Sequence, residues 1–317
     1  MRSPTRRRLL QITAGLAALG AGPAIPRHLH HRWTGSALGA GATLDLYHTD
    51  RVRASRLVTQ VVAEVDRLES IFSLQRQTSS LSRLNRDGRL TRPPLELVTV
   101  LEAAAMFSGL SGGAFDVTVQ PLWRLFADAA APGATPCDRA IADALALVGW
   151  RRVGLDRASL GFGRTGMAAT LNGIAQGYIT DRITDLLRDA GVADVLVDLG
   201  ELRAMGTPPR GRFWHVATAM GEVRLGSGGL AVSAAQTADC CLAAGSPNLL
   251  SPLTGRPVLD GRIVVVMAPS ALLADAASTA LAASEPTAIG PLTARLAPLG
   301  IAVANNTILF EKSQPML

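Results

Sequence analysis

Apolar residues recur at helical spacing in two long segments of the first half of the chain. In residues 54–72 they lie three or four positions apart, which predicts an amphipathic helix. A second helix is predicted over residues 95–110, ended by Gly112 and Gly113. Alternation at Leu44 and Leu46 predicts a strand before the first helix, and residues 73–88 are expected to form a loop between the two helices.

The segment from Thr170 to Gly206 couples a glycine-punctuated turn to a helix and then to a strand. Gly173 and Gly177 leave room for the backbone to approach a phosphate or a metal ion closely. An amphipathic helix follows, and Gly191 stands where a C-cap belongs. Residues 192–199 alternate like a buried strand, and two carboxylates, Asp198 and Glu201, come at its end. The segment is therefore either a ligand-binding turn or an ordinary helix and strand with solvated charges.

The second half mixes the two periodicities without a strict strand–helix–strand order. Strands are predicted near residues 213–219, 230–233 and 262–267, and a last helix over residues 270–283, stopped by Pro286. This arrangement favours an α+β fold over a doubly wound parallel sheet.

The amino terminus has the features of an export signal. Thr5-Arg6-Arg7-Arg8-Leu9-Leu10-Gln11 is a twin-arginine pattern, and a short apolar run and small residues follow it. The expected organisation is a signal peptide in residues 1–24, a flexible segment in 25–35 and one domain in 36–317. The alternative is a basic helix that stays attached as an anchor. The Ala/Pro/Gly-rich residues 128–136 are expected to be a surface insertion.

Charge and composition exclude some classes of protein. The formal net charge is +6, and removal of Arg2, Arg6, Arg7 and Arg8 with the leader would leave +6 − 4 = +2, so binding to nucleic acid is not suggested. Cys137, Cys240 and Cys241 have no metal-ligand spacing, and their disulfide pairing stays open. The histidines at 28, 30 and 31 are interpreted as part of a flexible tail rather than a metal site.

Four stretches carry a resemblance to a known family. They are the opening segment, SLQRQTSSLSRLNRDG from Ser73, SGGAFDVTVQPLW from Ser111 and LLADAASTAL from Leu272. In order and spacing they resemble the ApbE family of flavin transferases, and TLNGIAQG with PLW looks most like the subgroup that accompanies periplasmic nitrous-oxide reduction. The resemblance implies a single α+β domain with a flavin site in a cleft between its halves. It also implies a periplasmic enzyme that uses FAD and Mg²⁺ and moves FMN onto a threonine hydroxyl of a redox protein.

The same resemblance implies the site residues. Asp275 and Thr279, four apart on a predicted helix, would share a face and bind the metal ion together with the backbone carbonyl of Gly173. The residues implied to contact the cofactor are Leu38, Ala114, Phe115, Asp116, Thr170, Gln176 and Leu249.

Several positions depart from the family pattern. Gln75 stands where an aromatic residue packs on the cofactor, Thr170 replaces an aspartate, and Gln176 replaces a lysine or glutamate. Asn248 and Ser251 replace a histidine and an aspartate, so the best candidate for a general base is gone. Asp198 or Glu201 would then have to take the threonine proton, unless the metal ion activates the hydroxyl directly. The rival hypotheses are an FAD-binding accessory protein of a redox system without covalent chemistry, and a hydrolase that cleaves FAD to FMN and AMP.

Overall fold

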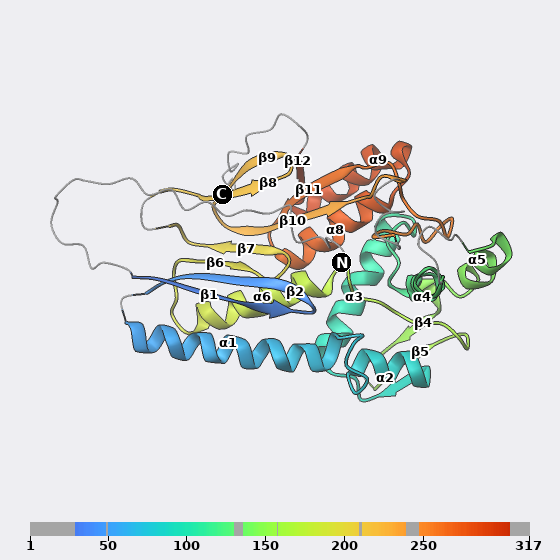
Figure 1. Cartoon of the computed structure of the whole chain (residues 1–317), viewed down its shortest axis with the longest axis horizontal. Helices are drawn as coiled ribbons and strands as arrows, with labels where there is room; N and C mark the ends of the chain where they lie inside the picture. The colour runs from blue at the N-terminus through green and yellow to red at the C-terminus, as the bar shows by residue number, and fades with distance from the viewer. Residues whose placement is uncertain are drawn as a thin grey trace.

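The computed structural model of this chain describes residues 29–48, 50–129, 136–156, 158–208, 211–238 and 247–304. A seven-stranded sheet runs through the centre, with its strands in the order β1-β2-β6-β7-β10-β11-β12 and every neighbouring pair antiparallel (Figure 1). The strands are β1 (Leu29–Ala37), β2 (Ala40–His48), β6 (Val195–Asp198), β7 (Leu202–Met205), β10 (Gly228–Ala234), β11 (Ile263–Ala268) and β12 (Ala302–Ala304).

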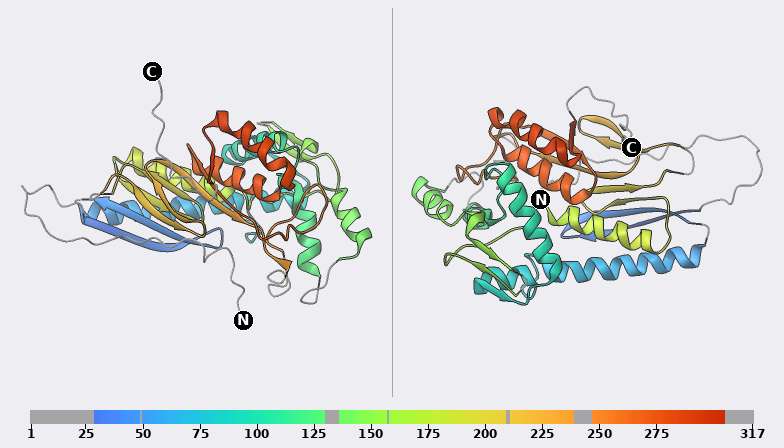
Figure 2. Two further views of the ribbon diagram at one scale, coloured as in Figure 1. Left: turned by 90° about the horizontal axis from the view of Figure 1, so that it is seen from above. Right: turned by 180° about the vertical axis from the view of Figure 1, so that it is seen from behind.

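Three helices cover one face of this sheet, as the two views of Figure 2 show. They are α1 (Arg51–Phe72), α6 (Ala175–Asp189) and α8 (Ala271–Ala283). α1 contacts β1 and β2, α6 contacts β6 and β7, and α8 contacts β10 and β11. The main hydrophobic core fills the space between these helices and the sheet.

The amphipathic pattern of α1 explains its place. Asp50 caps its first turn by accepting hydrogen bonds from the backbone N–H groups of Val52 (2.8 Å) and Arg53 (3.1 Å). The apolar stripe that predicts the helix is its buried face, with Val61 and Leu68 both fully buried. The predicted helix over residues 54–72 is thus confirmed, with three more residues at its start.

α6 and α8 approach each other unusually closely. A Cβ atom on Gly177 would lie 2.4 Å from the backbone oxygen of Ala271, so only glycine permits this spacing. Asp181 of α6 also caps α8, because its carboxylate accepts hydrogen bonds from the backbone N–H groups of Ala271 (2.8 Å) and Leu272 (3.0 Å). Arg203 of β7 pairs with the same carboxylate at 2.7 Å. These contacts fix α8, which carries Asp275 and Thr279, relative to α6 and the turn before it, which contains Gly173.

The hairpin of β8 (Trp214–Thr218) and β9 (Gly221–Leu225) packs against the other face of the sheet. Trp214 and Val216 form a second, smaller core with Leu196 and Leu202. β6 is therefore buried from both sides: Val195 and Val197 belong to the main core, and Leu196 belongs to the smaller one.

The remaining elements lie toward one end of the central sheet, on the right in Figure 1. A three-stranded sheet there has the order β3-β5-β4. Its strands are β3 (Arg89–Thr91), β5 (Ser159–Phe162) and β4 (Val153–Leu155). The helices are α2 (Ser80–Asp87), α3 (Leu95–Leu110), α4 (Gln120–Asp128), α5 (Asp138–Leu145) and α9 (Pro286–Leu296), with 3₁₀ turns at Val117–Val119, Trp150–Arg152 and Ala297–Leu299.

The α+β prediction is confirmed, but two local predictions are wrong. Residues 29–35, expected to be flexible, belong to β1, where His30 is held by Asp45 at 2.6 Å instead of lying in a tail. Residues 80–87 form a helix, capped by the Ser79 side chain and ended by Gly88, whereas a loop was expected. That short helix is mostly polar, and its two fully buried residues, Leu81 and Leu84, are too few to show a clear helical pattern in the sequence.

Several other predictions fall outside the described residues. They concern the signal peptide, residues 25–28 with His28, most of the 128–136 insertion, and the cysteines at 240 and 241. Cys137 is described and is an exposed free thiol. Across the described ranges, no helix has both the length and the apolar character needed to cross a membrane.

Candidate functional site

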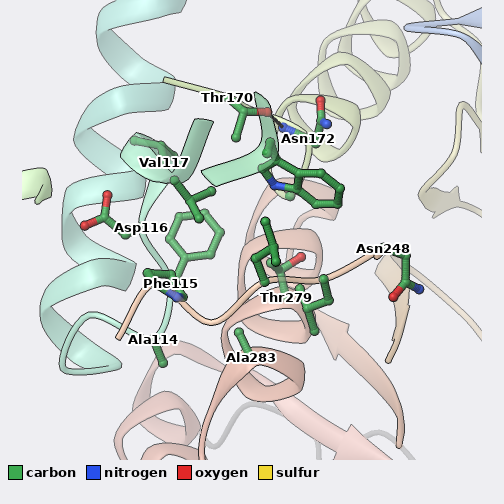
Figure 3. Close-up of a pocket in the computed structure, with 15 residues that line it drawn as sticks. Ala114, Phe115, Asp116, Val117, Thr170, Asn172, Asn248, Thr279 and Ala283 are labelled. Atoms are coloured by element: carbon green, nitrogen blue, oxygen red, sulfur yellow. Dashed lines mark hydrogen bonds between the residues drawn. The ribbon is translucent and has the colours of Figure 1, made fainter. Parts of the chain in front are cut away.

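A pocket opens between segments from the two halves of the chain (Figure 3). It takes in about 480 Å³, part of it open to solvent. The turn and helix start at 114–123, the turn at 170–173, the segment 248–252 and the second half of α8 form its walls. The residues that line it are Ala114, Phe115, Asp116, Val117, Val119, Trp123, Thr170, Asn172, Gly173, Asn248, Leu249, Leu250, Pro252, Thr279 and Ala283. Seven of the predicted site residues therefore meet here, although they come from distant parts of the sequence.

The carboxylate of Asp116 organises the pocket wall instead of facing a ligand. It accepts hydrogen bonds from the backbone N–H (2.8 Å) and hydroxyl (2.6 Å) of Thr118 and from the backbone N–H of Trp150 (2.9 Å). In Figure 3 it points away from Thr279 and Asn248. Burial raises the pKa of this carboxyl above its usual value, while the three hydrogen bonds act in the opposite direction. Asp116 thus holds the turn that presents Ala114 and Phe115.

The turn at Thr170 is tied to that wall by main-chain contacts. The Thr170 N–H donates to the carbonyl of Val117 at 2.7 Å, and the Thr170 hydroxyl accepts from the Asn172 N–H at 3.3 Å. Asn85 of α2 braces the preceding residue from both sides, bonding to the N–H of Ala169 at 2.7 Å and to its carbonyl at 2.8 Å. Sequence reasoning did not single out Asn85 or Asn172, although Asn85 lies in the SRLN part of a motif that carried the resemblance.

Asp275, Thr279 and Gly173 come together where α8 meets the turn before α6. The Asp275 carboxylate is 1% exposed and accepts a hydrogen bond from the Gly177 N–H at 3.1 Å. A Cβ atom on Gly173 would lie 2.8 Å from the Thr279 hydroxyl, so the glycine leaves its backbone close to that oxygen. The Thr279 hydroxyl also lies 3.3 Å from that of Ser233. A carboxylate, a hydroxyl and a backbone carbonyl are the oxygen donors that suit Mg²⁺, which keeps its other positions for water and phosphate.

Asn248 presents an amide at the far side of the pocket. Its side-chain N–H donates to the carbonyl of Ala234 at 2.6 Å, and its backbone N–H donates to Gln236 Oε1 at 2.8 Å. Because a carbonyl can only accept, this bond fixes which end of the amide is nitrogen. The neighbouring Leu249 lines the pocket, while Ser251 is buried in the next turn and accepts from the Thr254 N–H at 3.3 Å.

Leu38 and Gln176, two of the predicted cofactor contacts, do not line this pocket. Leu38 sits in the turn between β1 and β2 with a positive φ of 46°, and its N–H donates to Glu69 Oε1 at 2.7 Å. Gln176 packs against Gly200, where a Cβ atom would come within 2.5 Å of its side-chain nitrogen. Their predicted role in binding the flavin remains a prediction.

The two carboxylates proposed as bases also lie outside the pocket. Asp198 follows Val197 on β6, so its side chain shares the face of Leu196, which is opposite to the face covered by α6 and α8. Glu201 is 4% exposed, and its backbone carbonyl accepts from the Thr180 hydroxyl at 3.1 Å. Strand alternation therefore separates Asp198 from the metal-ligand candidates.

Asp198 should instead make the stability of the fold depend on pH. Burial raises the pKa of its carboxyl from 3.8 to about 6; Asp45 adds to this effect, whereas the Gly200 N–H and Arg32 oppose it. The folded state then binds a proton that the unfolded chain has already lost, so stability falls as pH rises from about 4 to above 6, by up to about 3 kcal/mol. Urea unfolding across this range should show a smaller decline in the Asp198→Asn variant than in the wild type; part of the decline remains because burial also raises the pKa of Asp116. The exposed control Asp189→Asn should keep the full decline; an unchanged slope in Asp198→Asn would contradict the assignment.

Comparisons with known proteins identify the family of the chain. The model of the ApbE family matches residues 38–301, so the chain belongs to the ApbE family. It is 26% identical over 243 residues to the FAD:protein FMN transferase of Vibrio cholerae serotype O1, covering 70% of this chain and 72% of that one. The corresponding Salmonella typhimurium protein is 26% identical over 265 residues, covering 77% and 76%.

Solved structures show the same fold. The apo form of the flavinyl transferase ApbE from Pseudomonas stutzeri has a TM-score of 0.74 and 27% identity, covering 87% of this chain and 92% of that one. The flavin transferase ApbE from Vibrio cholerae has a TM-score of 0.73 at 23% identity, covering 87% and 93%. The predicted family and fold are thus both confirmed.

Proposed function

We propose that the protein is an exported FAD:protein FMN transferase that uses Mg²⁺ and modifies a threonine of a periplasmic or membrane redox protein. The observation that carries the proposal is the meeting of Asp275, Thr279 and Gly173 beside a pocket that Gly173 and Thr279 also line. The names of the relatives support the transferase activity. The oxygen-only donor set supports the choice of magnesium.

In this reaction the threonine hydroxyl oxygen forms a bond to the phosphorus of the FMN half of FAD. The bond from that phosphorus to the bridging oxygen breaks, and its electron pair leaves with AMP. Bound Mg²⁺ would neutralise the pyrophosphate charge. The chain's own residues orient the parts: the turn at 170–173 and the Asp116-braced turn form the walls, and Asn248 faces the same space.

The hydroxyl proton has no obvious acceptor in the described part of the pocket. Asp116 is the one lining residue there with an ionisable side chain, and its oxygens accept three hydrogen bonds. An amide such as that of Asn248 accepts a hydrogen bond but does not take up a proton at neutral pH. We therefore expect the proton to leave through solvent and the wild-type transfer to be slow.

Mass spectrometry of a threonine-bearing acceptor domain tests the proposal. After incubation with the purified protein, FAD and Mg²⁺, the acceptor should gain one FMN less one water. An acceptor with alanine in place of the threonine should gain nothing. An unchanged mass in the threonine form after long incubation would contradict the transferase.

A second function is favoured by the amide at position 248. Without a base at that position, the protein would bind FAD and act as an accessory protein of a redox system, with no covalent product. This alternative predicts FAD binding by calorimetry together with an unmodified acceptor.

Export is proposed from the leader pattern in residues 1–24, with the domain beginning at β1. Changing Arg6 and Arg7 to lysine together should leave the precursor in the cytoplasm, because the twin-arginine route reads that pair. Cell fractionation and immunoblotting would show this, with the Arg2→Lys variant as a matched control that is exported. Normal periplasmic amounts of the double variant would contradict the leader assignment.

A further inference from the structure

Two buried serines lie next to Thr279, the candidate metal ligand that lines the pocket (Figure 3). Ser233 of β10 is 3% exposed and Ser278 of α8 is 0% exposed. On β10, Ser233 shares its face with Ala231 and Ala235, which belong to the main core, and α8 packs against this strand. A hydroxyl buried in such apolar surroundings is unfavourable unless it forms hydrogen bonds, so the partners of the two serines indicate their role.

The hydroxyls of Thr279, Ser233 and Ser278 form a continuous hydroxyl network. The Thr279 and Ser233 hydroxyl oxygens lie 3.3 Å apart, and those of Ser233 and Ser278 lie 2.8 Å apart. The Ser278 hydroxyl in turn donates to the backbone carbonyl of Asp275 at 3.0 Å. The hydroxyl network therefore begins at one candidate metal ligand and ends at the backbone of another.

The single proton of each hydroxyl fixes the direction of every bond in this network. The Asp275 carbonyl can only accept, so the Ser278 proton points at it. Ser278 then has no second proton to donate and accepts from Ser233, and Ser233 for the same reason accepts from Thr279. Reversing either bond between two hydroxyls would cost another bond of the network. The Thr279 proton therefore points at Ser233.

We propose that Ser233, supported by Ser278, is a positioning residue that turns the lone pairs of the Thr279 oxygen toward the metal ion. An alcohol binds a cation through its lone pairs, and a proton directed at the cation would oppose binding. With its proton on Ser233, Thr279 keeps its lone pairs for the side of Gly173, where a Cβ atom would lie 2.8 Å from the Thr279 oxygen. The proposal rests on the proposed function and extends it by naming residues behind the ligand that set how tightly Mg²⁺ is held.

Calorimetry of FAD binding to the mature protein over a series of MgCl₂ concentrations tests the proposal. The MgCl₂ concentration at which half of the magnesium effect is reached, the magnesium midpoint, reports the affinity for the ion. Ser233→Ala removes the acceptor of the Thr279 proton and should raise the magnesium midpoint by about 10- to 100-fold, the cost of losing a partner behind a metal ligand. Ser233→Thr keeps the hydroxyl and should stay close to the wild type.

Ser278→Ala tests the direction of the hydroxyl network. Without Ser278 to accept its proton, the Ser233 hydroxyl can donate to Thr279 instead, and the Thr279 proton must then turn elsewhere. The magnesium midpoint should therefore rise in Ser278→Ala as well, although Ser278 bonds to Ser233 and to the Asp275 carbonyl rather than to the Thr279 hydroxyl. The double variant should have the same midpoint as Ser233→Ala alone, because Ser278 acts through Ser233.

Ser108→Ala is the matched control, because the Ser108 hydroxyl is also fully buried and donates to a helix carbonyl, that of Ala104 in α3, at 2.8 Å. Its magnesium midpoint should equal that of the wild type. An unchanged midpoint in Ser233→Ala, or an equal rise in Ser108→Ala, overturns the positioning role while the wild type still shows its magnesium effect. A wild type whose FAD affinity does not respond to Mg²⁺ contradicts the proposed function, and the positioning role with it. Thermal melting identifies a variant that unfolds; if Ser233→Ala does so, an unchanged midpoint in Ser278→Ala overturns the role.

Discussion

Calorimetry should show that the Asp275→Ala variant no longer gains FAD affinity when Mg²⁺ is added. Asp275 is the single carboxylate among the three candidate ligands, so the alanine variant removes the negative charge from this ligand set. The residue is 1% exposed, so little solvent is near enough to compensate for the lost ligand. Removal of a residue that hydrogen-bonds to a metal ligand costs about 10- to 100-fold in metal affinity or activity. Removal of the ligand itself should therefore lower the metal affinity by at least about 100-fold. Transfer to an acceptor should fall with it.

A conservative variant guards against misreading a folding defect. Asp275→Asn keeps an oxygen that can accept from the Gly177 N–H, so it removes the charge while leaving that contact in place. It should lose the magnesium effect as well. Asp189→Ala, an exposed aspartate at the end of α6, is the control that should behave like the wild type. A full magnesium effect in both Asp275 variants would place the ion elsewhere.

Asn248→His, combined with Ser251→Asp, should accelerate FMN transfer by about 10²- to 10⁴-fold, the contribution of a general base. The Ala234 carbonyl that now accepts from the Asn248 amide would accept from one ring N–H of the histidine, leaving the other ring nitrogen as a base. Aspartate at 251 can accept from the Thr254 N–H as the serine does.

Single-turnover kinetics, read as acceptor mass against time, would measure the gain. Asn248→Gln is the matched control, since it keeps an amide and should give no acceleration. If the double variant transfers no faster than the wild type, another group already takes the proton.

Much of the fold was predictable because its longest elements have clear periodicity. The stripe of α1, the bounds of α3 and the helix of α8 follow from apolar spacing and caps. The short helix α2 was missed because only two of its residues are buried. β1 was missed because it follows a basic leader-like segment and carries exposed polar residues, and its order comes from pairing along the whole of β2.

The candidate site was predictable in part for a similar reason. The spacing of Asp275 and Thr279 on one helix is a local feature, which the sequence states directly. The role of Asp116 was not local: its partner Trp150 lies 34 residues away, so hydrogen bonding by its carboxylate could not be inferred from the motif. The position of Asp198, by contrast, could have been predicted from the sequence. Because side chains alternate along a strand, Asp198 must lie on the face opposite to that of Val197.

The central claim is that this chain moves FMN from FAD to a threonine, and one reaction tests it most directly. The purified protein, FAD, Mg²⁺ and the acceptor domain are incubated together, and AMP, free FMN and labelled acceptor are counted in the same sample. We predict one AMP for each labelled threonine, with little free FMN. AMP and free FMN in equal amounts without labelled acceptor would indicate a hydrolase, and bound FAD without any AMP would indicate an accessory protein; either result would contradict the transferase.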